Sequence, residues 1–283
     1  MRPGTGIRRV IVVVLDGVRP DAVELFDLVH LRRLMAGGAS SLSATTVTPS
    51  VTTAAMTSLL TGVSPAAHGI MTDRVFIPKT AGGLRPLPSV LAGHGFPSVA
   101  YMADVPTILR GIAARVGRAF GFDTLRLAGK SAPEILLAAR QTLRLQRRGL
   151  IVFHWPDADR AGHAHGWMSG AYAEACCRLD GTLGMLAALS DVPHDPHTLL
   201  IALADHGGGG VVSNDHEADH PLDRTIPLVL SGGAVNQMTL NRPRLIDVPP
   251  TVLHALGIDC PAIYEGRALL EAFAGIEAAA AVA

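Results

Sequence analysis

An aspartate and a histidine stand side by side at the end of an unbroken apolar run, and together they could bind a metal ion. Residues 199–204 are all apolar, Asp205 and His206 follow, and four glycines come next. Such a run is typical of a strand that is buried on both faces of a parallel sheet. A carboxylate and an imidazole at the carboxyl end of a strand suit a Zn²⁺-like ion. The alternative is an aspartate that caps a turn beside an unrelated histidine.

Other predicted strand ends carry the same residue types. Asp16 directly follows a short β-branched run, and Gly17 comes after it. The carboxyl ends of parallel strands meet at one rim of a sheet, so we expect these side chains to converge there. Further candidates are the two acids and two histidines after residues 149–155, and the histidines of the 213–220 loop: Asp157, Asp159, His163, His165, His216 and His220.

The segment 44–62 is dense in hydroxyl groups and brings Thr52 and Thr53 to the start of a predicted helix. Pro49 and Ser50 break the extended chain before it. Backbone N–H groups point outward at a helix N-terminus, which makes this position a suitable anion site. A hydroxyl there can instead be an ordinary helix cap without chemistry. Local pattern alone leaves both interpretations open.

Alternating strand and helix patterns predict an α/β protein with a mostly parallel sheet. The chain has no internal repeat, low-complexity linker or clean domain boundary. We expect Asp21 to cap the first helix and Gly37 and Gly38 to end it. The predicted strands are 10–15, 99–102, 149–155, 199–204 and 224–232, and the predicted helices are 22–35, 54–60, 87–94, 132–148, 171–189 and one from Pro249 or Pro250 to Gly257.

Composition argues against several classes of partner. The chain has 283 residues with 24 Lys+Arg and 24 Asp+Glu, so bulk charge indicates neither a nucleic acid nor an acidic membrane as partner. Three cysteines make no disulfide framework, which favours a reducing compartment. The N-terminal apolar run is too short for a signal peptide, and no stretch is long enough to span a membrane. We therefore expect a cytoplasmic protein.

Five motifs, taken in order, resemble those of the alkaline phosphatase superfamily. The closest similarity is to its type I phosphodiesterase/nucleotide pyrophosphatase branch. The resemblance covers residues 8–272 and implies a single hydrolase domain over 1–283, with 273–283 as a frayed tail. It also implies a three-layer sandwich in which helices cover both faces of a mostly parallel sheet. The motifs are Asp16-Gly, Pro49-Ser-Val-Thr52, Thr61-Gly-x-x-Pro-x-x-His68-Gly-Ile, Asp159-x-x-Gly-His163-x-x-Gly and Ala204-Asp205-His206-Gly.

The resemblance implies two divalent metal ions, Zn²⁺ with Mn²⁺ as the alternative, and a small phosphorylated substrate. Thr52 would be the nucleophile, with Thr53 as the fallback. Asp157 is the alternative to Asp159 as a ligand, and His220 is the alternative to His216. The implied ligands are Asp16, Thr52, Asp205 and His206 for one ion and Asp159, His163 and His216 for the other.

The resemblance implies a phosphodiesterase or pyrophosphatase that works through a phosphothreonine intermediate. One departure concerns the Phe-Pro-Asn that usually follows the nucleophile in this branch, where this chain has Thr53-Ala54-Ala55. The missing asparagine would donate to a phosphate oxygen, so backbone amides or an arginine must replace it, or the substrate differs. A phosphomonoesterase or phosphonate hydrolase stays open, and a non-catalytic metal-binding or phospholigand-binding protein is the less favoured alternative.

Two other branches of the superfamily fit the sequence poorly. A sulfatase would need a Cys or Ser in a Cys/Ser-x-Pro-x-Arg setting, and a cofactor-independent phosphoglycerate mutase would need a large inserted domain. We expect the specificity elements within residues 70–130, where no motif identifies the substrate, and the oligomeric state stays open. We expect His68 to order its loop or to face the substrate, and His154, His165 and His220 to support the site as neighbours of the ligands.

Overall fold

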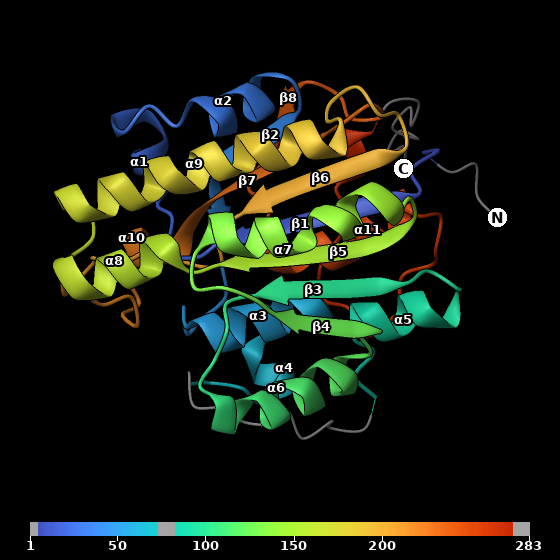
Figure 1. Cartoon of the computed structure of the whole chain (residues 1–283), viewed down its shortest axis with the longest axis horizontal. Helices are drawn as coiled ribbons and strands as arrows, with labels where there is room; N and C mark the ends of the chain where they lie inside the picture. The colour runs from blue at the N-terminus through green and yellow to red at the C-terminus, as the bar shows by residue number, and fades with distance from the viewer. Residues whose placement is uncertain (1–4, 73–82, 274–283) are drawn as a thin grey trace, which may run out of the picture.

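A mixed β-sheet with helices packed around it forms the centre of the computed structural model, which describes residues 5–72 and 83–273 (Figure 1). The sheet has eight strands in the order β4-β3-β5-β1-β6-β7-β2-β8. Their bounds are β1 Arg9–Leu15, β2 Ala39–Thr45, β3 Ser98–Met102, β4 Thr124–Leu127, β5 Gly149–Trp155, β6 Thr198–Leu203, β7 Thr225–Gly232 and β8 Met238–Thr239.

The three central strands β5, β1 and β6 are parallel and buried along their whole length. Their sequences RVIVVVL, GLIVFHW and TLLIAL are almost entirely apolar. This composition follows from burial of both faces, because helices cover each side of the sheet. The carboxyl ends of these strands therefore meet at one rim, as the apolar runs predicted.

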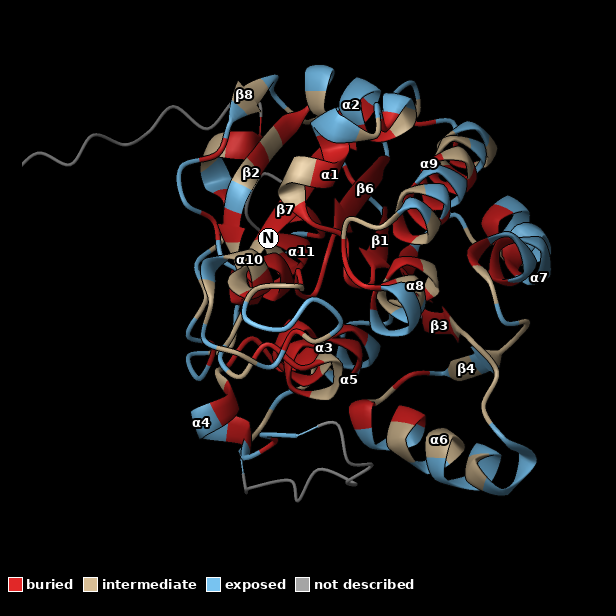
Figure 2. Ribbon diagram, turned by 90° about the vertical axis from the view of Figure 1, so that its left-hand side faces the viewer, coloured by how far each residue is buried: buried red, intermediate tan, exposed pale blue. Residues whose placement is uncertain are grey.

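Strand β7 is antiparallel to both of its neighbours, β6 and β2. It therefore begins at the rim where β1, β5 and β6 end. The sheet is mostly parallel, as predicted, with β7 as the exception in the described part of the sheet. Helices α1, α2, α7 and α9 lie on one side of the sheet and α3, α5, α6 and α11 on the other (Figures 1 and 2). The predicted three-layer α/β class is confirmed.

The helices have the following bounds: α1 Pro20–Leu25, α2 Val29–Ala36, α3 Thr52–Thr61, α4 Pro65–His68, α5 Leu87–Gly93, α6 Thr107–Phe120, α7 Ala132–Leu145, α8 Asp157–His165, α9 Gly170–Ser190, α10 Pro221–Arg224 and α11 Val248–Ala255, with short 3₁₀ turns at Leu245–Asp247 and Leu270–Ala272. None of the helices in the described ranges is long and apolar enough to cross a bilayer.

The helix predicted over 22–35 is two helices, α1 and α2, so this prediction was wrong. Asp27 adopts a positive φ of 48° between them. The second helix is capped from outside, because the Asp180 carboxylate on α9 accepts the backbone N–H groups of His30 and Leu31 at 3.0 and 2.8 Å. Asp21 lies inside α1, where it pairs with Arg19 and does not cap the helix.

The predicted frayed tail lies mostly outside the described residues, which end at Phe273. Phe273 itself is buried and forms an isolated bridge with Val235. Residues 73–82, within the 70–130 region where we expect the specificity elements, also lie outside the described ranges.

Candidate active site

The ends of β1, β5 and β6 bring three acidic segments together at one rim. Register pairs Val14 of β1 with His154 of β5 on one side and with Leu203 of β6 on the other. Asp16 and Asp205 therefore emerge next to each other, and both are buried. The backbone N–H of Asp159, at the start of α8, donates to the Asp16 carbonyl at 3.0 Å.

His206 lies at the centre of this group, with its ring fully buried. Its Nε2 is 3.2 Å from Asp16 Oδ1 and 3.8 Å from Asp205 Oδ2. The same nitrogen is 3.0 Å from Thr52 Oγ1. One imidazole therefore contacts the two buried carboxylates and the hydroxyl of the predicted nucleophile.

Asp159 is the centre of a second group. Its Oδ1 is 3.4 Å from His163 Nε2, 3.8 Å from His216 Nε2 and 4.0 Å from His206 Nε2. The rings of His206 and His216 are stacked, with centroids 3.8 Å apart. His163 is the most open member, with 45% of its side chain exposed. All seven residues implied by the resemblance thus lie in one continuous cluster.

Three of these imidazoles are oriented in the same way by the backbone. The Nδ1 atoms of His163, His206 and His216 are 2.9, 2.8 and 2.7 Å from the carbonyl oxygens of Asn214, Gly207 and Ser50 respectively. A ring nitrogen that bonds a carbonyl must carry the proton, so Nε2 is the atom left for a ligand. Each ring directs that Nε2 into the cluster.

The cluster also contains a histidine that we expected only as a neighbour of the ligands. His154, the penultimate residue of β5, is buried, and its Nε2 is 3.2 Å from Asp16 Oδ2. Asp16, His154 and Asp205 offer ligand atoms within 4.8 Å of one another, as do Asp159, His206 and His216. His154 belongs to no linear motif, and only the register of β5 against β1 brings it to Asp16.

Crowding of like charges perturbs the carboxyl groups. Burial and the negative charge of Asp16 raise the pKa of Asp159 to about 8 and that of Asp205 to about 6. Burial opposes ionisation of Asp16 as well, but the nearby imidazoles of His154 and His206 outweigh it and lower its pKa. The three acids therefore cannot all ionise without additional positive charge.

The pKa values of His206 and His216 shift in opposite directions in this cluster. Burial disfavours the cationic form of His206, but Asp205 and Asp16 outweigh it and raise its pKa well above the ordinary value. Burial and the neighbouring His206 lower the pKa of His216 to about 4.

Four buried polar atoms of the cluster lack a hydrogen-bond partner among the described residues. They are Asp16 Oδ1, Asp159 Oδ1, Asp205 Oδ2 and His154 Nε2. A buried polar atom without a partner is costly, and a divalent cation would satisfy several of these atoms together. Oxygen and imidazole nitrogen are ligands that Zn²⁺ accepts, so the residues present fit the metal centre that the resemblance implies.

Thr52 is the first residue of α3, and Val51 before it is extended. The turn that leads into the helix also supports the histidine loop, because Ser50 Oγ donates to the His216 carbonyl at 2.6 Å. The Ser50 carbonyl in turn bonds His216 Nδ1. The same turn therefore sets the positions of both Thr52 and His216.

The loops of the site meet with almost no spare space. A Cβ added to Gly17 would lie 2.9 Å from the Asp159 Cα atom, and a Cβ on Gly208 would overlap the Trp167 ring. Trp167 Nε1 donates to the Gly17 carbonyl at 2.9 Å. Glycine at these positions allows the segments after β1, β5 and β6 to approach closely.

The alternative ligands lie elsewhere. Asp157 Oδ2 accepts the Ala132 backbone N–H at 2.9 Å, at the start of α7. His220 caps α10, with Nδ1 accepting from Leu222 N. His165 is exposed at the end of α8. Neither Asp157 nor His220 contacts the cluster through any described interaction.

His68 is buried and orders its own loop. Its Nε2 is 2.9 Å from Ser58 Oγ, and its Nδ1 accepts the Ile70 backbone N–H at 3.1 Å. Burial lowers the pKa of His68 to about 4, which is consistent with a neutral structural residue.

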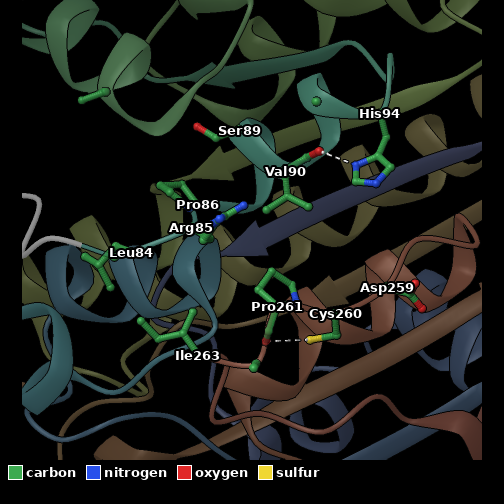
Figure 3. A pocket seen from close by; sticks show the side chains of 14 residues that line it. Leu84, Arg85, Pro86, Ser89, Val90, His94, Asp259, Cys260, Pro261 and Ile263 are labelled. Atoms are coloured by element: carbon green, nitrogen blue, oxygen red, sulfur yellow. Dashed lines mark hydrogen bonds between the residues drawn. The ribbon is translucent and has the colours of Figure 1, made fainter.

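A cavity of about 830 Å³ lies away from this cluster, between α5 and the loop that follows α11 (Figure 3). Val90 and His94 lie on one side of it and Asp259 and Cys260 on the other. It contains none of the predicted ligands. A smaller cavity adjoins Thr52 itself.

Two solved structures share the fold of this chain. Murine ectonucleotide pyrophosphatase/phosphodiesterase 5, as an inactive variant in complex with AMP, matches with a TM-score of 0.71 and 15% identity, covering 90% of this chain and 96% of that one. A protein in the alkaline phosphatase superfamily from Vibrio parahaemolyticus matches with a TM-score of 0.71 and 17% identity, covering 94% and 71% respectively. At these identities the two structures show the fold, and the predicted resemblance to the superfamily is confirmed by the family match of the sequence.

The sequence matches the type I phosphodiesterase/nucleotide pyrophosphatase family over residues 10–83 and 98–252, and the chain belongs to this family. A curated relative, the 2,3-bisphosphoglycerate-independent phosphoglycerate mutase of Syntrophotalea carbinolica, is 27% identical over 143 residues. That match covers 50% of this chain and only 27% of the mutase. These proteins belong to a superfamily of phosphoryl hydrolases and transferases that uses divalent metals.

Proposed function

We propose that this chain is a di-metal phosphohydrolase that cleaves phosphodiester or pyrophosphate bonds with Thr52 as the nucleophile. One observation carries the proposal. The Thr52 hydroxyl lies 3.0 Å from His206 Nε2, beside a cluster in which carboxylate oxygens of Asp16, Asp159 and Asp205 have no hydrogen-bond partner among the described residues. Such a cluster around a hydroxyl suits phosphoryl transfer by two metal ions.

Two sets of side chains would hold the ions. Asp159, His163 and His216 form one set, and Asp16, Asp205 and His206 form the other, with the Thr52 hydroxyl. His206 lies at comparable distances from Asp205 and Asp159, 3.8 and 4.0 Å, so it stands at the junction of the sets. His154 is an additional candidate beside Asp16. Zn²⁺ is the ion that the mixed oxygen and nitrogen donors favour, and Mn²⁺ is the alternative.

Thr52 is well suited to act as the nucleophile. A bound divalent cation supplies positive charge that lowers the pKa of a nearby hydroxyl and stabilises the leaving oxygen. Thr52 Oγ1 then attacks phosphorus in line, forming a phosphothreonine while the ester P–O bond breaks. Water cleaves the phosphothreonine in the second step, and two inversions give net retention at phosphorus.

The oxyanion donor that Ala55 lacks must come from elsewhere. The Arg19 guanidinium is committed to the Asp21 carboxylate and to the Gly208 carbonyl, so it is not available for this role. The first turn of a helix has backbone N–H groups without intrahelical acceptors, and α3 begins at Thr52. We propose that backbone amides at this turn bind the phosphate oxygens.

Hydrolysis of bis-p-nitrophenyl phosphate and p-nitrophenyl phosphate with added Zn²⁺ or Mn²⁺ tests the activity and separates diester from monoester cleavage. Preference for the monoester would favour the phosphomonoesterase alternative, and a methylphosphonate ester would reveal a phosphonate hydrolase. Absence of hydrolysis of all three esters would overturn the proposed function.

Matched variants test the nucleophile. Thr52→Ala should lower kcat by more than about 1,000-fold, because loss of a covalent nucleophile removes the main route. Thr52→Ser keeps a hydroxyl and should retain part of the activity. Thr53→Ala is the control for the neighbouring hydroxyl. If Thr53→Ala abolishes hydrolysis and Thr52→Ala does not, the assignment of the nucleophile is wrong.

Metal content separates the enzyme from a non-catalytic phospholigand-binding protein that kept the fold. Elemental analysis should find bound metal in the wild type and less in Asp205→Ala. Metal binding without hydrolysis of any ester would favour the binding protein. Protein that takes up no metal would contradict both the di-metal mechanism and the metal-binding alternative.

A further inference from the structure

A cavity of about 220 Å³ lies beside the predicted nucleophile, with Thr52 and His154 in its wall. It extends away from the acidic cluster, among α3, α6 and the strands β3, β4 and β5, which lie together in the lower half of Figure 1. Met56, Leu60, Tyr101, Val116 and Phe120 contribute to its wall. The cavity therefore borders the hydroxyl at which the proposed reaction takes place.

The wall offers few free polar groups. No carboxylate, lysine or arginine among the described residues lines it. The Thr57 hydroxyl donates to the Thr53 carbonyl at 2.7 Å, and the Tyr101 hydroxyl is 2.6 Å from Thr142 Oγ1. The His154 Nε2 faces Asp16 at 3.2 Å. The hydroxyls of Thr57 and Tyr101 are thus already engaged, and His154 is turned toward the metal-ligand cluster.

The wall of this cavity therefore disfavours binding of polar substituents of a substrate. A nucleobase or a sugar carries donors and acceptors that would lose water here without gaining protein partners, which is costly. An alkyl or aryl group gains free energy by leaving water. A cavity of about 150 Å³ lined by apolar side chains is known to bind benzene, so this larger one has room for an aromatic ring or a chain of several carbons.

We propose that this cavity binds an apolar ester group of the substrate, so that the enzyme prefers phosphodiesters carrying an alkyl or aryl substituent over nucleotide esters. The inference rests on the proposed phosphodiesterase activity and names the substrate class for the same site. It also assigns a role to residues 100–125, which lie in the region where no sequence motif identified the substrate.

A series of p-nitrophenyl alkyl phosphates from methyl to hexyl tests the inference on the wild-type enzyme. All members share the p-nitrophenolate leaving group, so differences in kcat/KM report on the alkyl group. We expect a gain of about fourfold for each methylene that becomes buried, and at least about 20-fold between the methyl and hexyl esters. Thymidine 5′-p-nitrophenyl phosphate should be a poorer substrate than the hexyl ester.

Two negative results have different meanings. A methyl ester that is cleaved as well as the hexyl ester, or a preference for the thymidine ester, would overturn the apolar pocket and leave the phosphodiesterase standing. Failure to cleave any member of the series would overturn the proposed function, and the inference with it.

Val116→Trp fills the cavity from α6 and should reduce the ratio of kcat/KM for hexyl over methyl esters toward one. Ile112→Trp is the matched control, because Ile112 lies one turn earlier on the same helix, is 36% exposed and does not line the cavity. The control should keep the wild-type ratio. An unchanged ratio in folded Val116→Trp would contradict the location of the pocket.

Binding without turnover gives a second readout. Calorimetry should find hexylphosphonate bound more tightly than methylphosphonate, with a more negative heat-capacity change because apolar surface is buried. Equal affinities and equal heat-capacity changes for the two ligands would count against the inference.

Discussion

The charges of the metal-free site make the stability of this protein depend on pH in an unusual direction. Asp159 has a pKa of about 8 in the fold against an ordinary 3.8, and the pKa of His206 is raised well above 6.5. Between pH 7 and 8 the folded state therefore retains protons at these groups that the unfolded chain has lost. A state that binds more protons is disfavoured as the pH rises, so we expect the metal-free fold to lose stability.

The size of the effect follows from the number of protons. Each proton held only by the folded state changes the free energy of unfolding by about 1.4 kcal/mol per pH unit. The shift at Asp159 alone should then lower the free energy of unfolding by about 1 kcal/mol between pH 7 and 8, and the raised pKa of His206 adds to this loss. His216 and His68, whose pKa values lie at about 4, oppose this change only weakly, because they are neutral in both states through most of this range.

Thermal unfolding of chelator-treated protein at constant ionic strength measures the effect. A loss of about 1 kcal/mol corresponds to a fall in Tm of roughly 2 to 4 °C for a chain of this size, and the His206 contribution adds to it. Asp159→Asn should show a smaller fall than the wild type, since only the His206 contribution remains. Added Zn²⁺ displaces the protons, so its stabilisation of the wild type should grow with pH. A Tm of the metal-free wild type that is constant or rises from pH 7 to 8 would refute this account.

Two further predictions compare matched substitutions. Asp159→Asn should lower kcat/KM for metal-dependent hydrolysis by at least about 100-fold, since loss of a residue that merely hydrogen-bonds to a metal ligand already lowers activity by about 10–100-fold. Asp157→Asn should change kcat/KM little. Equal losses in a kinetic assay would place Asp157 in the site. Gly62→Ala should lower the free energy of unfolding by about 2–5 kcal/mol, because its Cβ would lie 2.5 Å from the Tyr264 ring at a positive φ of 69°. Gly69→Ala is the control, at φ 77° with no atom within 4 Å, and should cost only about 1–2 kcal/mol. Denaturant titrations measure both values.

The parts of the fold that could be predicted are those where burial leaves a continuous signature. Strands β1, β5 and β6 are apolar throughout because both of their faces are covered, so their ends and the acids after them were visible in the sequence. Strand β2, with the sequence ASSLSAT, has no such run and was not predicted as a strand. Its place in the sheet depends on pairing with β7, which is a long-range contact.

Interactions between distant segments account for the remaining differences between the predicted and the observed structure. The break between α1 and α2 depends on Asp180, which lies about 150 positions away in the chain. The proximity of His154 to Asp16 depends on the register of two strands. Asp159 and His163 were visible as acid and histidine after a predicted strand and as part of a family motif, although the helix α8 that carries them was not predicted. The ends of apolar runs and the family motifs therefore identified the candidate ligands, and only the tertiary structure relates them to His154.

The glycine contacts at the rim have a consequence for how this protein could acquire new chemistry. At Gly17 and Gly208 any side chain would collide with Asp159 or with Trp167, so substitutions there disturb the acidic cluster as a whole. Val116 on α6 is only partly buried and contacts none of the predicted ligands through a described interaction. Laboratory selection for altered substrates therefore has a tolerant region beside an intolerant one. Substitutions around the cavity can change the substrate preference, while the glycines preserve the geometry of the acidic cluster.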